Sequence, residues 1–228
     1  MSRIAVLVSG GVDSAITYFL LKSKNGNDDI IPIFVNLGQS YWKKELAACK
    51  DLYGDQLVCL ETNAPTSDDK DNSFIPNRNL FLASYATLAV YPDVIHISGM
   101  ADDNRPDKTP KVFQEMSKIL TKTSEKRITV TSDLWEYGKS DAVRMFLDAG
   151  IPNAETIMLK TLSCYSHVGQ GHCNDCEACF RRWLAFAVNG IQCEPVSDAA
   201  TEKYAEYARS GGAHITRNND MRQLGLLE

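Results

Sequence analysis

The sequence predicts an α/β fold, in which a five-stranded, mostly parallel sheet carries helices on both faces and a small C-terminal module follows. Over the first 150 residues, short β-branched apolar runs alternate with segments in which apolar residues recur every three or four positions. The first pattern is typical of buried strands and the second of helices that lie on a sheet. Because parallel strands need long crossover connections, a helix between successive strands indicates parallel pairing.

The elements follow one another in a regular order. Residues 3–9 (RIAVLVS) form an apolar run that ends in glycines, which predicts the first strand. From Val12, apolar residues recur with helical spacing until Asn25-Gly26, a helix stop. Further strands are expected at Ile30–Val35, Gln56–Leu60, Val94–Ile97 and Arg127–Val130, and further helices near Trp42–Tyr53, Asn79–Tyr91, Val112–Leu120 and Asp141–Ala149.

The end of this alternation predicts a domain boundary. Ser140 is expected to cap the last helix, Gly150 lies just past its end, and Pro152 follows. Residues 1–150 should therefore form one domain, and residues 151–228 a helical module packed on it. In that module, helices are expected near Phe180–Val188 and Thr201–Arg209, whereas residues 62–73 in the first domain should form a polar surface loop.

Composition narrows the class of function. The chain has 24 Lys and Arg against 29 Asp and Glu, a net charge of -5 that disfavours direct nucleic-acid binding and favours a small-molecule substrate. No apolar run reaches the roughly 20 residues of a membrane-spanning helix. The apolar run at residues 4–8 is too short for a signal peptide of roughly 7 to 15 apolar residues, so we expect a reducing, cytoplasmic location and no disulfides.

A glycine loop at residues 9–14, Ser-Gly-Gly-Val-Asp-Ser, lies between the first strand and the first helix. Backbone N–H groups at such a position can surround phosphate, Ser9 and Ser14 add hydroxyls, and Asp13 could hold Mg²⁺. The alternative interpretation is a tight turn capped by Asp13 or Ser14. The loop lacks the Walker and dinucleotide-binding glycine patterns.

Four of the seven cysteines form the pattern C-x8-C-x2-C-x2-C at Cys164, Cys173, Cys176 and Cys179. Four closely spaced thiolates suit a closed, structural zinc site. The alternatives are an iron–sulfur cluster, a redox dithiol or four unpaired buried thiols. His167 and His172 lie inside this segment and could compete as ligands, but with four cysteines present we expect them to be exposed to solvent.

The glycine loop resembles that of the PP-loop ATP pyrophosphatases, which cleave ATP between its α and β phosphates and adenylate a substrate oxygen. Together with the cysteines, the chain resembles one branch of these, the 7-cyano-7-deazaguanine synthase (QueC) family. The matching motifs are SGGVDS at Ser9, LGQ at Leu37, FIPNRN at Phe74, Ser98-Gly99, Gly138-Lys139-Ser140, and TLSCY followed by CNDCEAC.

This resemblance implies a PP-loop nucleotide-binding domain, a zinc-binding C-terminal module and a homodimer. It implies ATP, Mg²⁺ and Zn²⁺ as ligands, with zinc on the four cysteines. It also implies the conversion of 7-carboxy-7-deazaguanine and ammonia to 7-cyano-7-deazaguanine. The predicted nucleotide-binding residues are Val8, Ser9, Gly10, Gly11, Val12, Asp13, Ser14, Gly38 and Gln39.

The chemistry of such a reaction asks for positive charge near the α-phosphate. A carboxylate resists ammonia until adenylation supplies a leaving group, and a second adenylation can turn the resulting amide into a nitrile. Arg78 and Lys139 are the candidate cations, beside Asp13 and Ser14 as candidate catalytic residues. Alternatively, Lys139 is a solvated surface residue and Arg78 a structural one. The sequence singles out no general base.

Three departures from the family pattern leave the substrate open. Asn77 replaces a family glycine, and asparagine tolerates the left-handed conformation. Asn36-Leu37 replaces Asp-Tyr, and residues 103–107 replace a longer loop with two tyrosines. The alternatives are therefore an enzyme that stops at the amide or takes another deazaguanine acid, a tRNA thiolase-type enzyme, and a nucleotide-sensing module without turnover.

Overall fold

The computed structural model describes residues 2–24, 26, 28–62, 75–103, 105–166, 169 and 171–228. The predictions that fall on Asn25, residues 63–73, Phe74, Asn104 and His167 lie outside these described residues. The strands are β1 (Arg3–Leu7), β2 (Asp29–Asn36), β3 (Val58–Glu61), β4 (Val94–His96) and β5 (Thr129–Thr131). The helices are α1 (Val12–Lys24), α2 (Trp42–Tyr53), the short 3-10 helix η1 (Gly54–Gln56), α3 (Arg78–Val90), α4 (Pro110–Thr123), α5 (Lys139–Asp148), α6 (Ala154–Lys160), α7 (Glu177–Ala187), α8 (Asp198–Arg209) and α9 (Ile215–Gln223).

The five strands form one parallel sheet in the order β3-β2-β1-β4-β5. Ile4 of β1 is in register with Ile30 of β2 on one side and with Val94 of β4 on the other, so β1 lies at the centre. The chain runs outward from β1 to β3 and then returns to place β4 on the opposite side. The predicted fold class is confirmed, and the strand order reverses beside β1.

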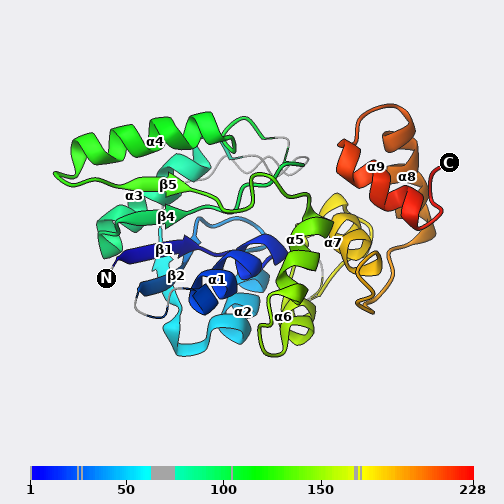
Figure 1. Ribbon diagram of the computed structural model, residues 1–228, viewed down its shortest axis with the longest axis horizontal. Helices are drawn as coiled ribbons and strands as arrows, with labels where there is room; N and C mark the ends of the chain where they lie inside the picture. The colour runs from blue at the N-terminus through cyan, green and yellow to red at the C-terminus, as the bar shows by residue number, and fades with distance from the viewer. Residues whose placement is uncertain are drawn as a thin grey trace.

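Helices cover both faces of the sheet, as the strand sequences require. Side chains alternate along a strand, so Ala5 and Leu7 of β1 face α3 and α4, while Ile4 and Val6 face α1 and α2. Figure 1 shows α4 above the sheet and α1 and α2 below it. Burial on both faces explains why β1 is apolar at successive positions rather than at alternate ones.

The C-terminal helices continue this packing without a gap. Ile16 of α1, Phe146 of α5, Met158 of α6 and Phe186 of α7 are all buried in one apolar cluster. Helices α8 and α9 pack on α7 at the end of the molecule that carries the C-terminus (Figure 1). Within the described ranges, none of the helices is both long and apolar enough to cross a bilayer.

One local prediction is wrong and one helix was not predicted, both for physical reasons. Helix α5 begins at Lys139, its N-cap is Gly138, and no side chain caps it. The hydroxyl of Ser140, predicted as the cap, donates instead to the carboxylate of Asp220 in α9. Helix α9 was not predicted, because its polar sequence buries only Arg217 and Met221 and so carries no apolar stripe.

Candidate active site

A cleft of about 1190 Å³ opens beyond the carboxyl ends of the central strands. It lies where the strand order reverses beside β1, the position at which open parallel sheets bind ligands. The predicted site residues that line it are Val8, Ser9, Gly11, Val12, Asp13, Ser14, Gln39, Arg78, Lys139, Cys164 and Cys176. Those that do not line it are Gly10, Gly38, Cys173 and Cys179.

The two glycines of the loop have different physical roles. Gly10 has a φ of +72°, and a Cβ there would lie 2.7 Å from the Cβ of Ala48 and 3.1 Å from the carbonyl oxygen of Glu45. Only glycine therefore allows the loop to lie this close to α2. A Cβ on Gly11 would meet its nearest atom at 3.4 Å, and Gly11 faces the cleft.

Hydrogen bonds within the glycine loop fix its shape. The Ser14 hydroxyl donates to the carbonyl of Gly11 at 3.1 Å and accepts from the backbone N–H of Ser9 at 3.4 Å. Helix α1 then begins, and the N–H of Ala15 donates a hydrogen bond to the same Gly11 carbonyl at 3.1 Å. The positive end of α1 and the residues before it thus face the cleft, which suits an anion.

Asp13 and Lys139 meet in the cleft although 126 positions separate them. Asp13 stands in the first turn of α1, Lys139 is the first residue of α5, and the Nζ of Lys139 contacts Oδ1 of Asp13. Lys139 is buried, so it is not a solvated surface lysine. The two side chains proposed to act on phosphate and metal are therefore adjacent.

A wall of buried charges continues from this pair. The Nη2 of Arg181 donates to Oδ2 of Asp102 at 2.8 Å, and Nη2 of Arg217 lies 3.7 Å from the same oxygen. Lys108 pairs with Asp103 at 2.7 Å. Burial raises the pKa of Asp102, but Arg181 and Lys139 lower it more, so the pKa lies below its ordinary value.

The same wall contains buried polar atoms without partners. Among the described residues, these include Oδ1 of Asp102 and the Nε groups of Arg181 and Arg217. Buried polar atoms in folded proteins are normally hydrogen-bonded, and leaving one unpaired costs about 1–3 kcal/mol.

A second polar group stands on the α2 side of the cleft. Gln39 is buried, its Oε1 accepts from the N–H of Leu37 at 3.0 Å, and its Nε2 donates to Oε2 of Glu45 at 2.9 Å. Arg78, the first residue of α3, lines the same cleft and acts electrostatically on Glu45. Its neighbour Asn77 has a φ of 58°, the left-handed conformation expected from the sequence.

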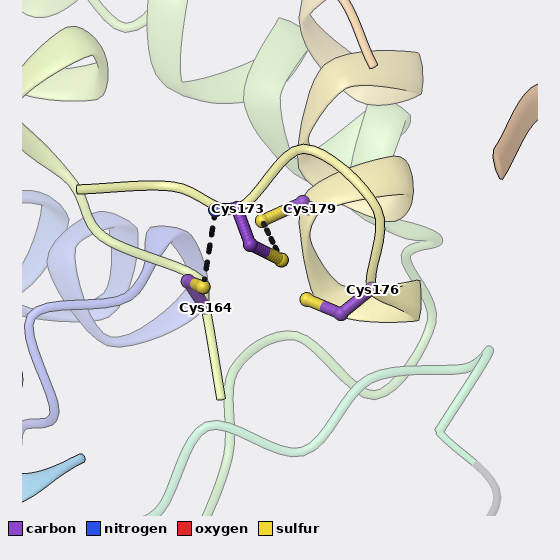
Figure 2. Close-up of side chains that lie close together, drawn as sticks. All are labelled: Cys164, Cys173, Cys176 and Cys179. Carbon is purple, nitrogen blue, oxygen red and sulfur yellow. Dashed lines mark hydrogen bonds between the residues drawn. The ribbon is translucent and has the colours of Figure 1, made fainter. Parts of the chain in front are cut away.

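The four cysteines form one cluster beside the cleft. Their sulfur atoms all lie within 4.8 Å of one another, and Sγ of Cys173 is 3.9 Å from Sγ of Cys179. Figure 2 shows the four side chains converging, with Cys176 at the N-cap of α7, Cys179 on its first turn, and the other two on the preceding segment. Zinc–sulfur bonds of about 2.3 Å put sulfurs about 3.8 Å apart in a tetrahedron, so the geometry fits a metal ion.

His172 corrects an expectation about this segment. It is half-buried rather than fully exposed, and its Nδ1 lies 3.6 Å from Sγ of Cys179. Its Nε2 lies 3.3 Å from the carbonyl of Thr161, a neighbouring segment of the cluster. The ring therefore packs against the thiols, which is the position of a group that supports a metal ligand.

Backbone and lysine contacts join the cysteine cluster to the glycine loop. The N–H of Leu162 donates to the carbonyl of Gly10 at 2.8 Å. Lys44 of α2 is buried and donates to the carbonyls of Ser166 at 2.8 Å and Gly171 at 3.2 Å. The cysteine segment is thus built onto the edge of the cleft.

Sequence reasoning missed a large part of this site. Asp102, Asp103, Arg181 and Arg217 gave no local pattern, and Glu45 stood inside a helix predicted only for its apolar stripe. One signal in the sequence could have indicated Glu45 as a site residue. It lies six positions after Gln39, at the start of the helix that follows a predicted nucleotide-binding loop.

Comparison with known proteins decides the family. The model of the family described as queuosine biosynthesis protein QueC matches residues 52–190. The chain belongs to the QueC family. It is 26% identical to a 7-cyano-7-deazaguanine synthase of Methanococcus maripaludis, over 84% of this chain and 96% of that protein. It is 27% identical to 7-cyano-7-deazaguanine synthase 1 of Desulfitobacterium hafniense, over 82% of this chain and 93% of that protein.

A comparison of structures gives more distant similarities. The U34-tRNA thiolase NcsA from Methanococcus maripaludis, solved with its [4Fe-4S] cluster, is 15% identical, with a TM-score of 0.48. The alignment covers 100% of this chain and 74% of the thiolase. A likeness at this level does not extend to function. The QueC match ends at residue 190, so α8, α9 and Arg217 lie beyond it.

Proposed function

We propose that this chain is an ATP-dependent ligase that converts 7-carboxy-7-deazaguanine and ammonia into 7-cyano-7-deazaguanine through adenylated acid and amide intermediates. The observation that carries the proposal is that one cleft holds the glycine loop, the Asp13–Lys139 pair and the edge of the cysteine cluster. Membership of the QueC family and the names of its relatives support the choice of substrate.

The residues of the cleft suit adenylation. The glycine loop and the start of α1 would bind the phosphates of ATP, and Lys139 would stabilise the charge that develops at the α-phosphate. Lys139 contacts Asp13 in this structure, so binding of ATP would have to exchange that contact for one to phosphate. Arg78 lines the Glu45 side of the same cleft, and it is the second candidate cation for the charge that develops at the α-phosphate.

The metals proposed from the sequence have residues that fit them. Cys164, Cys173, Cys176 and Cys179 would hold Zn²⁺, and four thiolates leave no open position, so its role would be structural. Asp13 would bind Mg²⁺, and Asp102 is a second carboxylate residue in the lining of the same cleft. Mg²⁺ would neutralise charge on the phosphates.

One assay tests the proposal. Purified protein is incubated with ATP, Mg²⁺, ammonium and the 7-carboxy acid, and the products are followed by mass spectrometry. We expect two AMP and two pyrophosphate for each nitrile. Accumulation of the amide would favour an enzyme that stops at that step. Release of ADP would reject the adenylation chemistry, and ATP binding without turnover would favour a nucleotide-sensing module.

The remaining proposals concern partners and location. The net charge of -5 supports a small-molecule substrate without direct nucleic-acid binding. A homodimer remains a prediction from the family resemblance, and a cytoplasmic location also remains a prediction. Light scattering of the purified protein tests the dimer.

A further inference from the structure

We propose that Glu45 is the general base that takes protons from nitrogen in both halves of the reaction, from ammonia as the amide forms and from the amide as the nitrile forms. This inference rests on the proposed function and fills a role for which the sequence singles out no residue. Glu45 stands on the first turn of α2 and lines the cleft. Its backbone carbonyl lies directly against Gly10, so the side chain starts beside the glycine loop.

The carboxyl group of Glu45 is held in one orientation. Nε2 of Gln39 donates to its Oε2 at 2.9 Å, while Oε1 of Gln39 is fixed by the N–H of Leu37 at 3.0 Å. Among the described residues, no hydrogen bond to Oε1 of Glu45 is observed, and Glu45 lines the cleft. A base must reach its proton within hydrogen-bond distance, and a fixed carboxylate that lines the cleft meets that need.

The surroundings of Glu45 make it a stronger base than an ordinary carboxylate. Burial raises its pKa to about 7, although the Gln39 hydrogen bond and the positive charge of Arg78 on α3 lower it. The negative charge of Glu45 in turn helps to raise the pKa of the Tyr165 phenol, from the cysteine segment, and of the Cys49 thiol, from its own helix. A base whose pKa lies near the working pH is the most effective for proton transfer.

The proton transfers balance in each step. The ammonia nitrogen attacks the acyl carbon of the adenylate, a C–N bond forms, the C–O bond to AMP breaks, and one N–H proton passes to Glu45. In the second cycle, the amide oxygen attacks the α-phosphorus of another ATP and pyrophosphate leaves. The amide nitrogen loses one proton as the imidate forms and a second as the C–O bond to AMP breaks to leave the nitrile. No oxidant or reductant is needed.

The test separates adenylation of the acid from the later steps in which nitrogen loses protons, which are formation of the amide and of the nitrile. Exchange of labelled pyrophosphate into ATP, driven by the 7-carboxy acid without ammonium, measures formation of the acyl-adenylate alone. For Glu45→Gln we expect exchange within about twofold of wild type, and amide and nitrile formation lower by about 10²- to 10⁴-fold. Hydroxylamine, a stronger nucleophile that is largely unprotonated at pH 7, should still trap the adenylate as hydroxamate.

The pH profile gives a second readout, which a merely structural role would not move. Because only the ionised carboxylate accepts a proton, wild-type kcat should rise with pH through an apparent pKa near 7. This limb should be absent in Glu45→Gln. Glu155→Gln, at an exposed position of α6, is the matched control and should behave as wild type.

Two results would overturn the assignment. One is an equal fall of exchange and ammonia-dependent rate in Glu45→Gln, and the other is a pH limb that persists in that variant. Failure of the proposed function looks different, because wild type itself would then show no exchange driven by the acid. The Gln side chain keeps the size of Glu and removes a buried charge, so we expect Glu45→Gln to fold.

Discussion

The cysteine cluster and the charged wall of the cleft lie side by side but are built in opposite ways. The cluster takes its four thiols from residues 164 to 179, and all four converge on one point. The wall takes its charges from Asp13, Asp102, Lys139, Arg181 and Arg217, which span most of the chain. A cluster that depends on one shared ion fails as a unit, whereas a wall of several pairs keeps part of its contacts when one residue is lost.

Replacing Cys176 by Ser should have the largest effect on stability. Structural zinc contributes an apparent binding free energy of about 10–16 kcal/mol in small zinc domains, so loss of one ligand should release the ion and lower the melting temperature strongly. Elemental analysis and calorimetry measure both effects. Cys59→Ser is the control, because that thiol is exposed on β3, and full metal retention in Cys176→Ser would contradict the four-thiolate site.

The cysteine cluster and the charged wall should respond to acid over different pH ranges. Zinc needs thiolates, so protonation releases it as the pH falls from 7 toward 4. Asp102 and Asp103 have folded-state pKa values below the ordinary value of about 3.9, because burial raises them but neighbouring cations lower them more. Their contribution to stability is therefore complete above pH 4 and is lost only as the pH falls through the lowered values.

A zinc-sensitive dye and NMR of the aspartate carboxyls follow these events separately. We expect the dye to respond while the Asp102 and Asp103 signals remain those of carboxylates. Simultaneous titration of both regions would show that the wall depends on the metal.

Replacing Lys139 by Met should affect activity more than stability. Loss of one preorganised charge at a developing anion lowers kcat by about 10²- to 10³-fold. Lys160→Met is the matched control, since Lys160 pairs with Asp51 on the surface at 3.0 Å and such pairs contribute about 0–1 kcal/mol. Unchanged pyrophosphate exchange in Lys139→Met would remove Lys139 from the adenylation step.

Replacing Arg217 by Gln should give the smallest of these effects, because Asp102 keeps Arg181. Loss of hydrogen bonds to charged groups costs about 1.5–3 kcal/mol, which denaturant unfolding measures. Arg222→Gln, exposed on the same helix, should stay within about 0.5 kcal/mol of wild type. If Arg217→Gln lowered the free energy of unfolding as much as Cys176→Ser does, the remaining ion pairs of the wall would not compensate for the loss of one arginine.

The sequence predicted those parts of the molecule whose residues are neighbours in the chain. The helix at Trp42–Tyr53 was placed at its observed bounds, because its apolar residues repeat every three or four positions. The cysteine cluster converges as expected, because short C-x2-C turns bring thiols together by themselves. Asn77 takes the left-handed conformation that its side chain tolerates.

The remaining features depend on contacts that no local pattern records. Ser140 looked like a helix cap, but Asp220, eighty positions later, takes its hydroxyl. Arg217 lies in a helix without an apolar stripe, and its role became visible only when the fold placed it 3.7 Å from Asp102. Glu45 is distinguished by burial and by Gln39, which are properties of the folded chain.

The hydrogen bond from Leu162 to the carbonyl of Gly10 connects the segment that leads to the cysteine cluster with the glycine loop. If a metal ion on the four thiols holds that backbone in place, then the metal-free protein has a lower affinity for nucleotide. Thermodynamic reciprocity then requires nucleotide to tighten the hold on metal by the same factor. The supply of the metal ion in the cell would in this way set the fraction of the enzyme that can bind ATP.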